Sequence, residues 1–270
     1  MGRADVSSAS RGLTKSAVCV DAVKEPKSVL RSRGTVPAIT IPVFAEGVPG
    51  VVHAFGTRSP WEPAIHKDRA PLQVVSVQQV HGIEALLLHS RMTDSEVREA
   101  ASMKGFDAII TDRPRTWVTV RTADSVPILL MGSDCGVIAS VHAGWRGTIG
   151  GIAGKVLRLM QDVFGCKLSS VRAAIGPSIG PCCYEVDEPV WAPLKRAFPY
   201  WSEAFEETGH GRGQLNLRRL NRLALEDAGV DTCRITEVNL CTACHPELFH
   251  SYRRDGTGTS HMTSGIVRIQ

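Results

Sequence analysis

Short apolar runs, rich in β-branched residues and bounded by turn-forming residues, recur along most of the chain from about residue 50. Runs of this length and composition are typical of buried β-strands. They predict strands at residues 51–55, 73–78, 108–111, 116–120, 126–130, 137–141, 172–175 and 266–269. The protein is therefore expected to be built mainly around β-sheet.

Two segments show instead the three- and four-residue spacing of amphipathic helices. In the first, apolar residues at positions 149, 152, 156, 160 and 163 form one stripe, and Gly165 follows as a helix-ending residue. In the second, residues 216–228, leucines share one side, with Asn216 as the N-terminal cap and Gly229 as the stop. Many strands, few helices and their mixed order predict a layered α+β domain.

The first part of the chain differs in composition from the rest. Residues 1–38 are rich in Ser, Lys, Arg and Gly and have no sustained apolar period, which predicts a flexible basic leader. Residues 39–270 contain no low-complexity linker and no internal repeat, so we expect them to form one domain.

Charge and hydropathy exclude several classes of protein. The chain has 31 Lys or Arg against 27 Asp or Glu, and residues 1–33, with seven basic against three acidic residues, hold the whole excess of +4. A nucleic-acid-binding domain would carry basic charge on the domain itself, so no nucleic-acid partner is expected. No run approaches the roughly 20 apolar residues of a membrane span, and no signal-peptide pattern is present. We therefore expect no membrane association and a cytoplasmic protein.

The eight cysteines lack the dense spacing of a small disulfide-rich domain, so mostly reduced thiols are expected. Cys241, Cys244 and His245 form a C-x-x-C-H sequence, the pattern of covalent haem attachment, but that interpretation requires an exported protein. A single C-x-x-C without a second pair is also a poor structural zinc site. Cys182 and Cys183 are expected to be packed thiols rather than ligands.

Residues 122–147 carry the most chemical information, because they predict a hairpin followed by a glycine-rich turn and a helix. If the hairpin turn is centred between Ser133 and Asp134, Ser125 lies opposite His142 with Cβ atoms roughly 4.5–5.5 Å apart. Both side chains would then point into one site. A register shift of one residue would place them on opposite faces of the sheet.

The glycine-rich turn after His142 is a candidate anion site. The backbone N–H groups around Gly144 and Gly147, at the start of a helix, can hold a phosphate or carboxylate, with Arg146 as a bidentate clamp. The alternative is that the glycines only allow the helix to pack closely on the sheet. His81 stands just past an apolar strand, where an imidazole can serve as a metal ligand or a base.

Several motifs occur together in the order found in one family. They are Val52-His-Ala-Phe-Gly-Thr-Arg58, Gln79-Val-His-Gly82, Asp107-Ala-Ile-Ile-Thr111, Thr122-Ala-Asp-Ser-Val-Pro127, Val141-His-Ala-Gly-Trp-Arg-Gly147, Ile175-Gly-Pro-Ser-Ile-Gly180, Cys183-Tyr-Glu-Val186, Cys241-Thr-Ala-Cys244 and Ser251-Tyr-Arg-Arg-Asp-Gly256. They resemble the multicopper polyphenol oxidase, or laccase-like, family, whose members are also called peptidoglycan editing factors and zinc-dependent purine nucleoside phosphorylases. The resemblance covers roughly residues 40–270.

The resemblance implies a single-domain α/β/β/α sandwich that binds zinc through two histidines and one cysteine. The histidines match His81 and His142, whereas Ser125 stands at the cysteine position. A serine hydroxyl is neutral near pH 7 and is a poor zinc ligand, so metal affinity should fall. Cys135 is too far away to replace it, because about seven residues of extended strand, roughly 23 Å, separate it from His142. The sequence does not place the other cysteines.

The implied reaction is attack of phosphate on C1′ of adenosine, inosine, guanosine or S-methyl-5′-thioadenosine, with adenosine deamination as a companion activity. Small-molecule nucleoside and phosphate are thus the implied partners, and zinc the cofactor, with copper as an alternative ion. Asp124 is the candidate for proton transfer or for supporting a histidine. The candidate residues are His81, Asp124, Ser125 and His142 for catalysis, His81, Ser125 and His142 for the metal, and Arg146, Gly144 and Gly147 for phosphate.

Two alternatives to this reaction remain open. The editing-factor name suggests a hydrolase for mis-made cell-wall nucleotide precursors, and the missing cysteine suggests a non-catalytic relative that binds a nucleoside. Copper-dependent phenol oxidation ranks lower, because a laccase needs several copper centres and many paired histidines. Of the nine histidines, only His81 and His142 have a convincing sequence context. The sequence does not indicate an oligomeric state.

Overall fold

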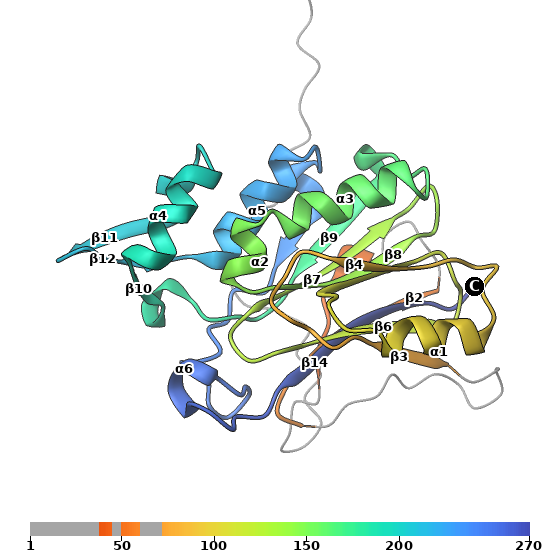
Figure 1. The fold of residues 1–270 in the computed structure, drawn as a ribbon, viewed down its shortest axis with the longest axis horizontal. Coiled ribbons are helices and arrows are strands. Elements are labelled where there is room, and N and C mark those ends of the chain that lie inside the picture. Colours follow the sequence, from red (N-terminus) through yellow and green to blue (C-terminus); the bar gives the residue numbers. More distant parts are fainter. Residues whose placement is uncertain (1–37, 45–49, 60–71) are drawn as a thin grey trace, which may run out of the picture.

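Two stacked β-sheets form the centre of the computed structural model, which describes residues 38–44, 50–59 and 72–270 (Figure 1). The expected leader, residues 1–38, lies almost wholly outside the described residues and stays a prediction. The five-stranded sheet consists, in spatial order, of β1 (Ala38–Ile39), β2 (Val51–Gly56), β14 (Met262–Arg268), β6 (Thr116–Thr122) and β3 (Gln73–Ser76). The six-stranded sheet consists of β13 (Ile235–Glu237), β9 (Val171–Ile175), β7 (Val126–Gly132), β8 (Ile138–Ala143), β5 (Ala108–Thr111) and β4 (Ala85–Leu88).

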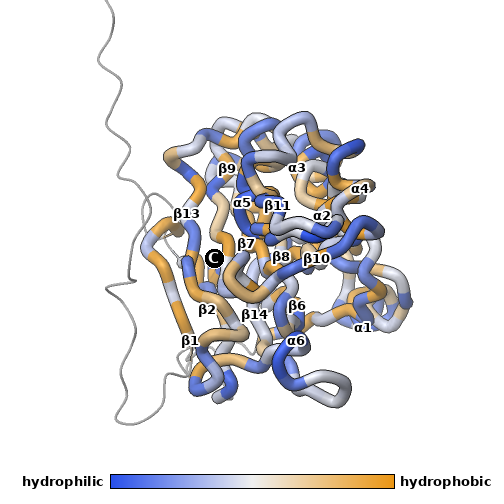
Figure 2. The backbone as a smooth tube through the Cα atoms, turned by 90° about the vertical axis from the view of Figure 1, so that its left-hand side faces the viewer, coloured by the Kyte–Doolittle hydropathy of each residue, from blue (hydrophilic) through white to orange (hydrophobic). Residues whose placement is uncertain are grey.

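The six-stranded sheet is apolar on both faces, as a sheet covered on both sides must be. Along β7, Leu129 and Met131 point toward the five-stranded sheet and pack with residues such as Val118 and Ile266. The alternate residues Ile128 and Leu130 belong to the core on the helical side. Figure 2 shows the resulting concentration of apolar residues along the central strands.

Helices cover the outer face of the six-stranded sheet and complete the layers. The helices on this face are α2 (Trp145–Ile149), α3 (Ile152–Asp162) and α5 (Leu217–Asp227), which share one apolar core with the sheet. α4 (Glu188–Ala197) lies beside a small sheet of β10 (Glu185–Asp187), β12 (Arg212–Leu215) and β11 (Phe205–Gly209), while α1 (Asp94–Ser102) packs against β3 and β4. α6 (Tyr252–Asp255) precedes β14. This arrangement confirms the expected layered α+β sandwich.

The helix expected from the apolar stripe at 149–163 is divided in the structure. α2 ends at Ile149, and α3 begins only at Ile152, because Gly151 adopts a left-handed conformation with φ of +78°. The second expected helix is confirmed as α5: the Asn216 side chain accepts a hydrogen bond from the Arg219 N–H, and Gly229 follows with φ of +104°. All eight expected strands are present, with small differences at their ends.

The register of the β7–β8 hairpin differs from the expected one by two residues. Pro127, not Ser125, lies opposite His142, because the hairpin loop is centred one residue later than expected and includes Gly136 with φ of +69°. Since side chains alternate with a period of two, this shift keeps Ser125 and His142 on the same side of the sheet. The expected convergence of the two residues therefore survives the wrong register.

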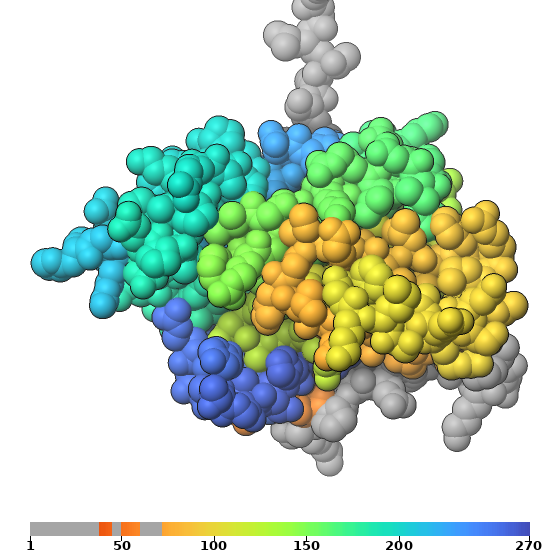
Figure 3. Space-filling view, viewed as in Figure 1, coloured from red at the N-terminus to blue at the C-terminus, as the bar shows by residue number. Residues whose placement is uncertain are grey.

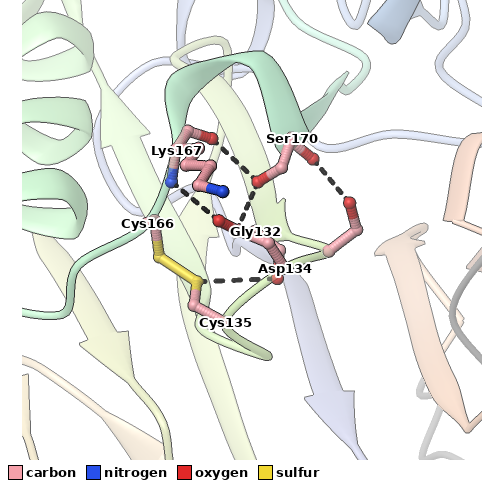
Figure 4. The surroundings of a disulfide bond; sticks show 7 residues. Gly132, Asp134, Cys135, Cys166, Lys167 and Ser170 are labelled. Carbon is pink, nitrogen blue, oxygen red and sulfur yellow. Dashed lines mark hydrogen bonds between the residues drawn. A yellow bond between two sulfur atoms is a disulfide. The ribbon is translucent and has the colours of Figure 1, made fainter.

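A disulfide joins Cys135, at the tip of this hairpin, to Cys166 in the segment after α3 (Figure 4). Beside it, the Asp134 carboxylate accepts hydrogen bonds from the Lys167 N–H, at 3.0 Å, and from the Ser170 hydroxyl. The expectation of reduced thiols is therefore wrong for this pair, and also for Cys233, which is disulfide-bonded as well. The prediction that Cys135 is remote from His142 agrees with its place at the opposite end of the hairpin.

Among the described residues, no helix combines the length and apolar character needed to cross a bilayer.

Candidate functional site

A cavity of about 650 Å³ opens at one end of the sheets, where segments from six parts of the chain meet. On the face shown in Figure 3, the blue segment carrying α6 lies next to the green of α2. The lining residues are Gln79, His81, Arg121, Ala123, Asp124, Ser125, His142, Gly144, Trp145, Arg146, Ile179, Tyr184, Leu217, Tyr252, Arg253, Gly258, Thr259 and His261. Most of the residues singled out in the sequence are in this set.

The two predicted histidines lie against one another in the cavity wall. The ring centroids of His81 and His142 are 4.9 Å apart, with the rings at 69°. Gly144 sits between them and Ser125: a Cβ on this residue would lie 3.1 Å from His81 Nδ1 and 3.2 Å from Ser125 Oγ. The glycine therefore leaves open the space toward which both imidazoles and the serine hydroxyl converge.

Asp107 organises both histidines, and sequence reasoning did not select it. Its buried carboxylate lies 2.7 Å from His142 Nδ1 and accepts hydrogen bonds from the backbone N–H groups of Val80, His81 and Gly82 at 3.2, 2.9 and 2.7 Å. These bonds hold His81 in a left-handed conformation, with φ of +59°, that a non-glycine residue seldom adopts. The sequence signal for it was its place at the start of the motif Asp107-Ala-Ile-Ile-Thr111, directly before a strand.

The electrostatics of this group favour an ionised Asp107 and a neutral His81. Burial opposes ionisation of Asp107, but the hydrogen bonds from His142 and Gly82 outweigh it and lower the pKa of the carboxyl. An ionised carboxylate only accepts hydrogen bonds, so His142 Nδ1 is the donor to Asp107, and Nε2 is the nitrogen left for another partner. Burial, followed by the nearby His142, lowers the pKa of His81, so this ring is neutral at pH 7.

Asp124 was expected to transfer a proton or to support a histidine, but its hydrogen bonds in the structure go to other residues. It adopts φ of +90°, its Oδ1 accepts a 2.6 Å hydrogen bond from the Thr242 hydroxyl, and its Oδ2 accepts one of 2.7 Å from the Arg253 N–H. The carboxylate that supports a histidine is Asp107. Asp124 instead connects the wall of the cavity to two later segments of the chain.

The residues expected to bind phosphate divide into two groups. Arg146 lines the cavity, exposed to solvent, with its guanidinium 4.3 Å from the Trp145 ring centroid, and Gly144 precedes α2 in the cavity wall. Gly147 is buried and does not line the cavity, and a Cβ there would lie 2.8 Å from the Gly82 carbonyl oxygen. For Gly147 the close-packing alternative is therefore the one that the structure supports.

Additional cations and an aromatic residue, not selected from the sequence, face the same cavity. Arg121 and Arg253 line it together with Arg146, whereas the lining carries a single carboxylate, that of Asp124. Burial raises the pKa of Tyr184 to about 12, so its hydroxyl keeps its proton, and the Arg253 guanidinium lies 5.1 Å from its ring centroid. Three guanidinium groups and an aromatic face suit an anionic ligand with a planar ring.

The donor set fits a zinc ion only in part. Two imidazoles, one of them fixed by a carboxylate, are typical zinc ligands. The third group at hand is the Ser125 hydroxyl, which binds zinc weakly in its neutral form. His81 and His142 would therefore hold the ion, with Ser125 as a weak third contact.

Comparison with known proteins gives a consistent assignment. The chain is 37% identical over 196 residues to the purine nucleoside phosphorylase YlmD of Geobacillus stearothermophilus, covering 72% of each protein. It is 34% identical over 197 residues to the adenosine deaminase RL5 of an unknown prokaryotic organism, covering 72% of this chain and 75% of that one. The crystal structure of YlmD from G. stearothermophilus matches with a TM-score of 0.75 and 29% identity, over 90% of this chain and 99% of that one.

A family model matches most of the chain. Residues 64–269 match the model described as multi-copper polyphenol oxidoreductase laccase, and this range includes both histidines of the cavity, Asp107 and the glycine-rich turn. With the fold, the paired imidazoles and the relatives in agreement, the chain belongs to the multi-copper polyphenol oxidoreductase laccase family.

Proposed function

We propose that the protein is a zinc-dependent purine nucleoside phosphorylase for adenosine, inosine, guanosine or S-methyl-5′-thioadenosine, with a companion adenosine deaminase activity. The observation that carries this proposal is the cavity, in which His81 and His142 face the same space as three arginine side chains. The names of the relatives, a purine nucleoside phosphorylase and an adenosine deaminase, support the same class of reaction.

In this reaction an oxygen of phosphate attacks C1′ of the nucleoside, the bond from C1′ to the purine nitrogen breaks, and the purine leaves with the bonding electrons. Arg146, Arg121 and Arg253 would bind the phosphate and orient it, since guanidinium groups form bidentate hydrogen bonds with phosphate. A bound zinc ion would supply positive charge that stabilises negative charge on a substrate oxygen. Asp107 would keep the His142 ring in position.

The leaving purine needs a proton, and Tyr184 is placed to provide one. Tyr184 lines the cavity, and its hydroxyl is protonated at neutral pH, because burial raises its pKa to about 12. A neighbouring guanidinium, that of Arg253, would stabilise the phenolate that forms. A Tyr184→Phe variant would keep the aromatic face and remove only this proton.

The test is release of free base from adenosine by the purified protein with and without phosphate. Turnover should require phosphate, and His81→Ala or His142→Ala should reduce it by a hundredfold or more, on the order of the loss expected for a metal ligand or a general acid–base group. Arg146→Ala should raise the KM for phosphate more than it lowers kcat. His210→Asn, at an exposed turn away from the cavity, is the matched control.

Ser125 supports one competing proposal, that of a nucleoside-binding protein without turnover. Its hydroxyl stands where the family has a cysteine thiolate, and this change lowers the metal affinity of the site. Binding of adenosine by calorimetry with no base released and no inosine formed, in protein loaded with zinc, would favour this alternative and reject the enzymatic proposal.

A further inference from the structure

A second group of possible metal ligands lies outside the histidine pair. Cys182 and Cys183 come from the turn before β10, and Cys241 and Cys244 from the turn after β13. The two turns run side by side, because Ser178 forms a bridge with Cys241. All four residues are free cysteines, and their sulfur atoms lie within 4.8 Å of one another.

The distances between the sulfurs match a tetrahedral metal site. Cys244 Sγ lies 3.4 Å from Cys183 Sγ and 3.5 Å from Cys182 Sγ. Four sulfurs around zinc, each about 2.3 Å from the ion, are about 3.8 Å apart. A disulfide would need about 2.05 Å. The four sulfurs are thus grouped closely enough to share one ion.

The surrounding backbone is arranged as it is around metal-bound thiolates. The Gly180 N–H donates a hydrogen bond to Cys241 Sγ at 3.2 Å, and such bonds stabilise a negatively charged sulfur. A Cβ on Gly180 would lie 3.2 Å from both Cys182 Sγ and Cys241 Cβ, so a side chain there would crowd the two cysteines. The closeness of the two turns is therefore built into the backbone.

A buried cation stands next to the cluster. Arg218 on α5 is 4% exposed, and its guanidinium donates hydrogen bonds to the carbonyl oxygens of Ser178 and Leu240, at 2.9 and 2.8 Å. Four thiolates and one divalent ion carry a net charge of −2, which a nearby guanidinium partly offsets. Cys182 and Cys244 are exposed, so an ion can reach the site from solvent.

We propose that Cys182, Cys183, Cys241 and Cys244 bind one zinc ion as four thiolates, with release of their thiol protons on binding. The sequence offered a C-x-x-C without a second pair, and the structure supplies that pair as Cys182 and Cys183. The ion would fasten the two turns that carry Tyr184 and the Thr242 hydroxyl bonded to Asp124. It is a structural site, separate from the histidines of the cavity.

Elemental analysis of the full-length protein, purified from zinc-supplemented medium, tests the proposal. Cys182→Ser/Cys244→Ser should lose one zinc per chain that His81→Ala/His142→Ala retains. Cys135→Ser/Cys166→Ser removes two cysteines outside the cluster and should retain that zinc as well. Equal zinc in the wild type and in a folded Cys182→Ser/Cys244→Ser variant would reject the site.

Thiol alkylation of the wild-type protein is a second test, which remains valid if the cysteine variant does not fold. The four thiols should resist alkylation in zinc-loaded protein and react once a strong chelator removes the ion. Substitution with cobalt should add thiolate-to-metal charge-transfer absorption, which the histidine site cannot produce. Rapid alkylation without chelator, disulfides among the four residues in peptide mapping, or iron in place of zinc would each overturn the proposal.

Discussion

Ser125 places a neutral hydroxyl oxygen at a position where a thiolate would bind zinc more tightly. Its Oγ faces the same space as the rings of His81 and His142, so the two imidazoles carry most of any metal affinity. At pH 7, protons compete only weakly with a metal ion for the His81 ring, because burial and then the neighbouring His142 lower its pKa. The strength of the third ligand therefore decides how tightly the ion is held.

Ser125→Cys should tighten zinc binding at the histidine site. A thiol loses its proton to zinc near neutral pH, whereas a hydroxyl does not, and changes around a metal ligand alter affinity on the order of ten- to a hundredfold. Competition with a chromophoric chelator measures the effect. Ser95→Cys, on the exposed side of α1, adds a thiol away from the site and should leave the affinity unchanged. The same affinity in both variants would show that residue 125 does not contact the metal.

His53 should make the protein less stable in mild acid. The Ile41 N–H donates to its Nε2 at 3.0 Å, and burial lowers the pKa of His53 to about 4. The unfolded chain takes up this proton near pH 6.5 and the folded chain does not, so stability is lost as the pH falls below 6.5. At pH 5 the loss from this residue is about 2 kcal/mol.

Denaturant unfolding of His53→Gln at pH 7 and pH 5 checks this. The glutamine can still accept the Ile41 N–H but does not titrate, so the variant should lose about 2 kcal/mol less than the wild type over this range. His210→Gln, at an exposed turn, should keep the wild-type slope. Equal pH slopes for His53→Gln and the wild type would refute the assignment.

At the scale of elements, the sequence predicted the strands and helices whose periodicity is strong. β7, β8 and α5 are long and apolar on a regular spacing, whereas β10 to β13 have only three to five residues each and show no readable period. α1 has a capping box formed by Thr93 and Glu96, but only Val97 within it is buried, so it carries no apolar stripe. Short or exposed elements are fixed by tertiary contacts that a local pattern does not contain.

The same limit applies to the site. The convergence of Ser125 and His142 followed from one hairpin, where alternation of side chains preserved the result despite the wrong register. Asp107 is 26 residues from His81 and 35 from His142, and only the folding of separate strands brings them together. The cysteine turns, about 60 residues apart, were missed for the same reason.

Gly147, where α2 approaches the turn at Gly82, should not tolerate a side chain. In Gly147→Ala the new Cβ would lie 2.8 Å from the Gly82 carbonyl oxygen, which is backbone and cannot rotate away. Overpacking of this kind costs about 1–3 kcal/mol, and displacement of the turn should also weaken zinc binding at His81. Chemical denaturation and the chelator assay measure the two effects.

Gly154→Ala in α3 is the matched control for Gly147→Ala. Its Cβ would meet only the end of the flexible Arg158 side chain, at 3.5 Å. Alanine favours the helix, so this variant should be up to about 1 kcal/mol more stable than the wild type. Equal stability of the two variants would show that α2 can move away from the turn without cost.

At the scale of the whole molecule, the Cys135–Cys166 disulfide and the cavity lie at opposite ends of the β7–β8 hairpin. A crosslink with a sequence separation of 31 lowers the entropy of the unfolded chain, which stabilises the folded state by about 3–4 kcal/mol. Reduction should therefore lower the melting temperature without changing zinc or nucleoside binding. Calorimetry with and without reductant tests this, and the melting temperature of Cys135→Ser/Cys166→Ser should respond less than that of the wild type. A residual response is expected, because Cys233 is also disulfide-bonded. An unchanged melting temperature for the wild type would mean that the bond adds no stability.

Because of the position of β14, the five-stranded sheet can be completed only late in synthesis. β14 is the last strand along the chain, yet it lies at the middle of the five-stranded sheet and pairs with both β2 and β6. While it is still inside the ribosome, the nascent sheet has a gap between two unpaired strand edges. The cavity, whose wall includes His261 just before β14, can form only after this strand emerges and closes the gap.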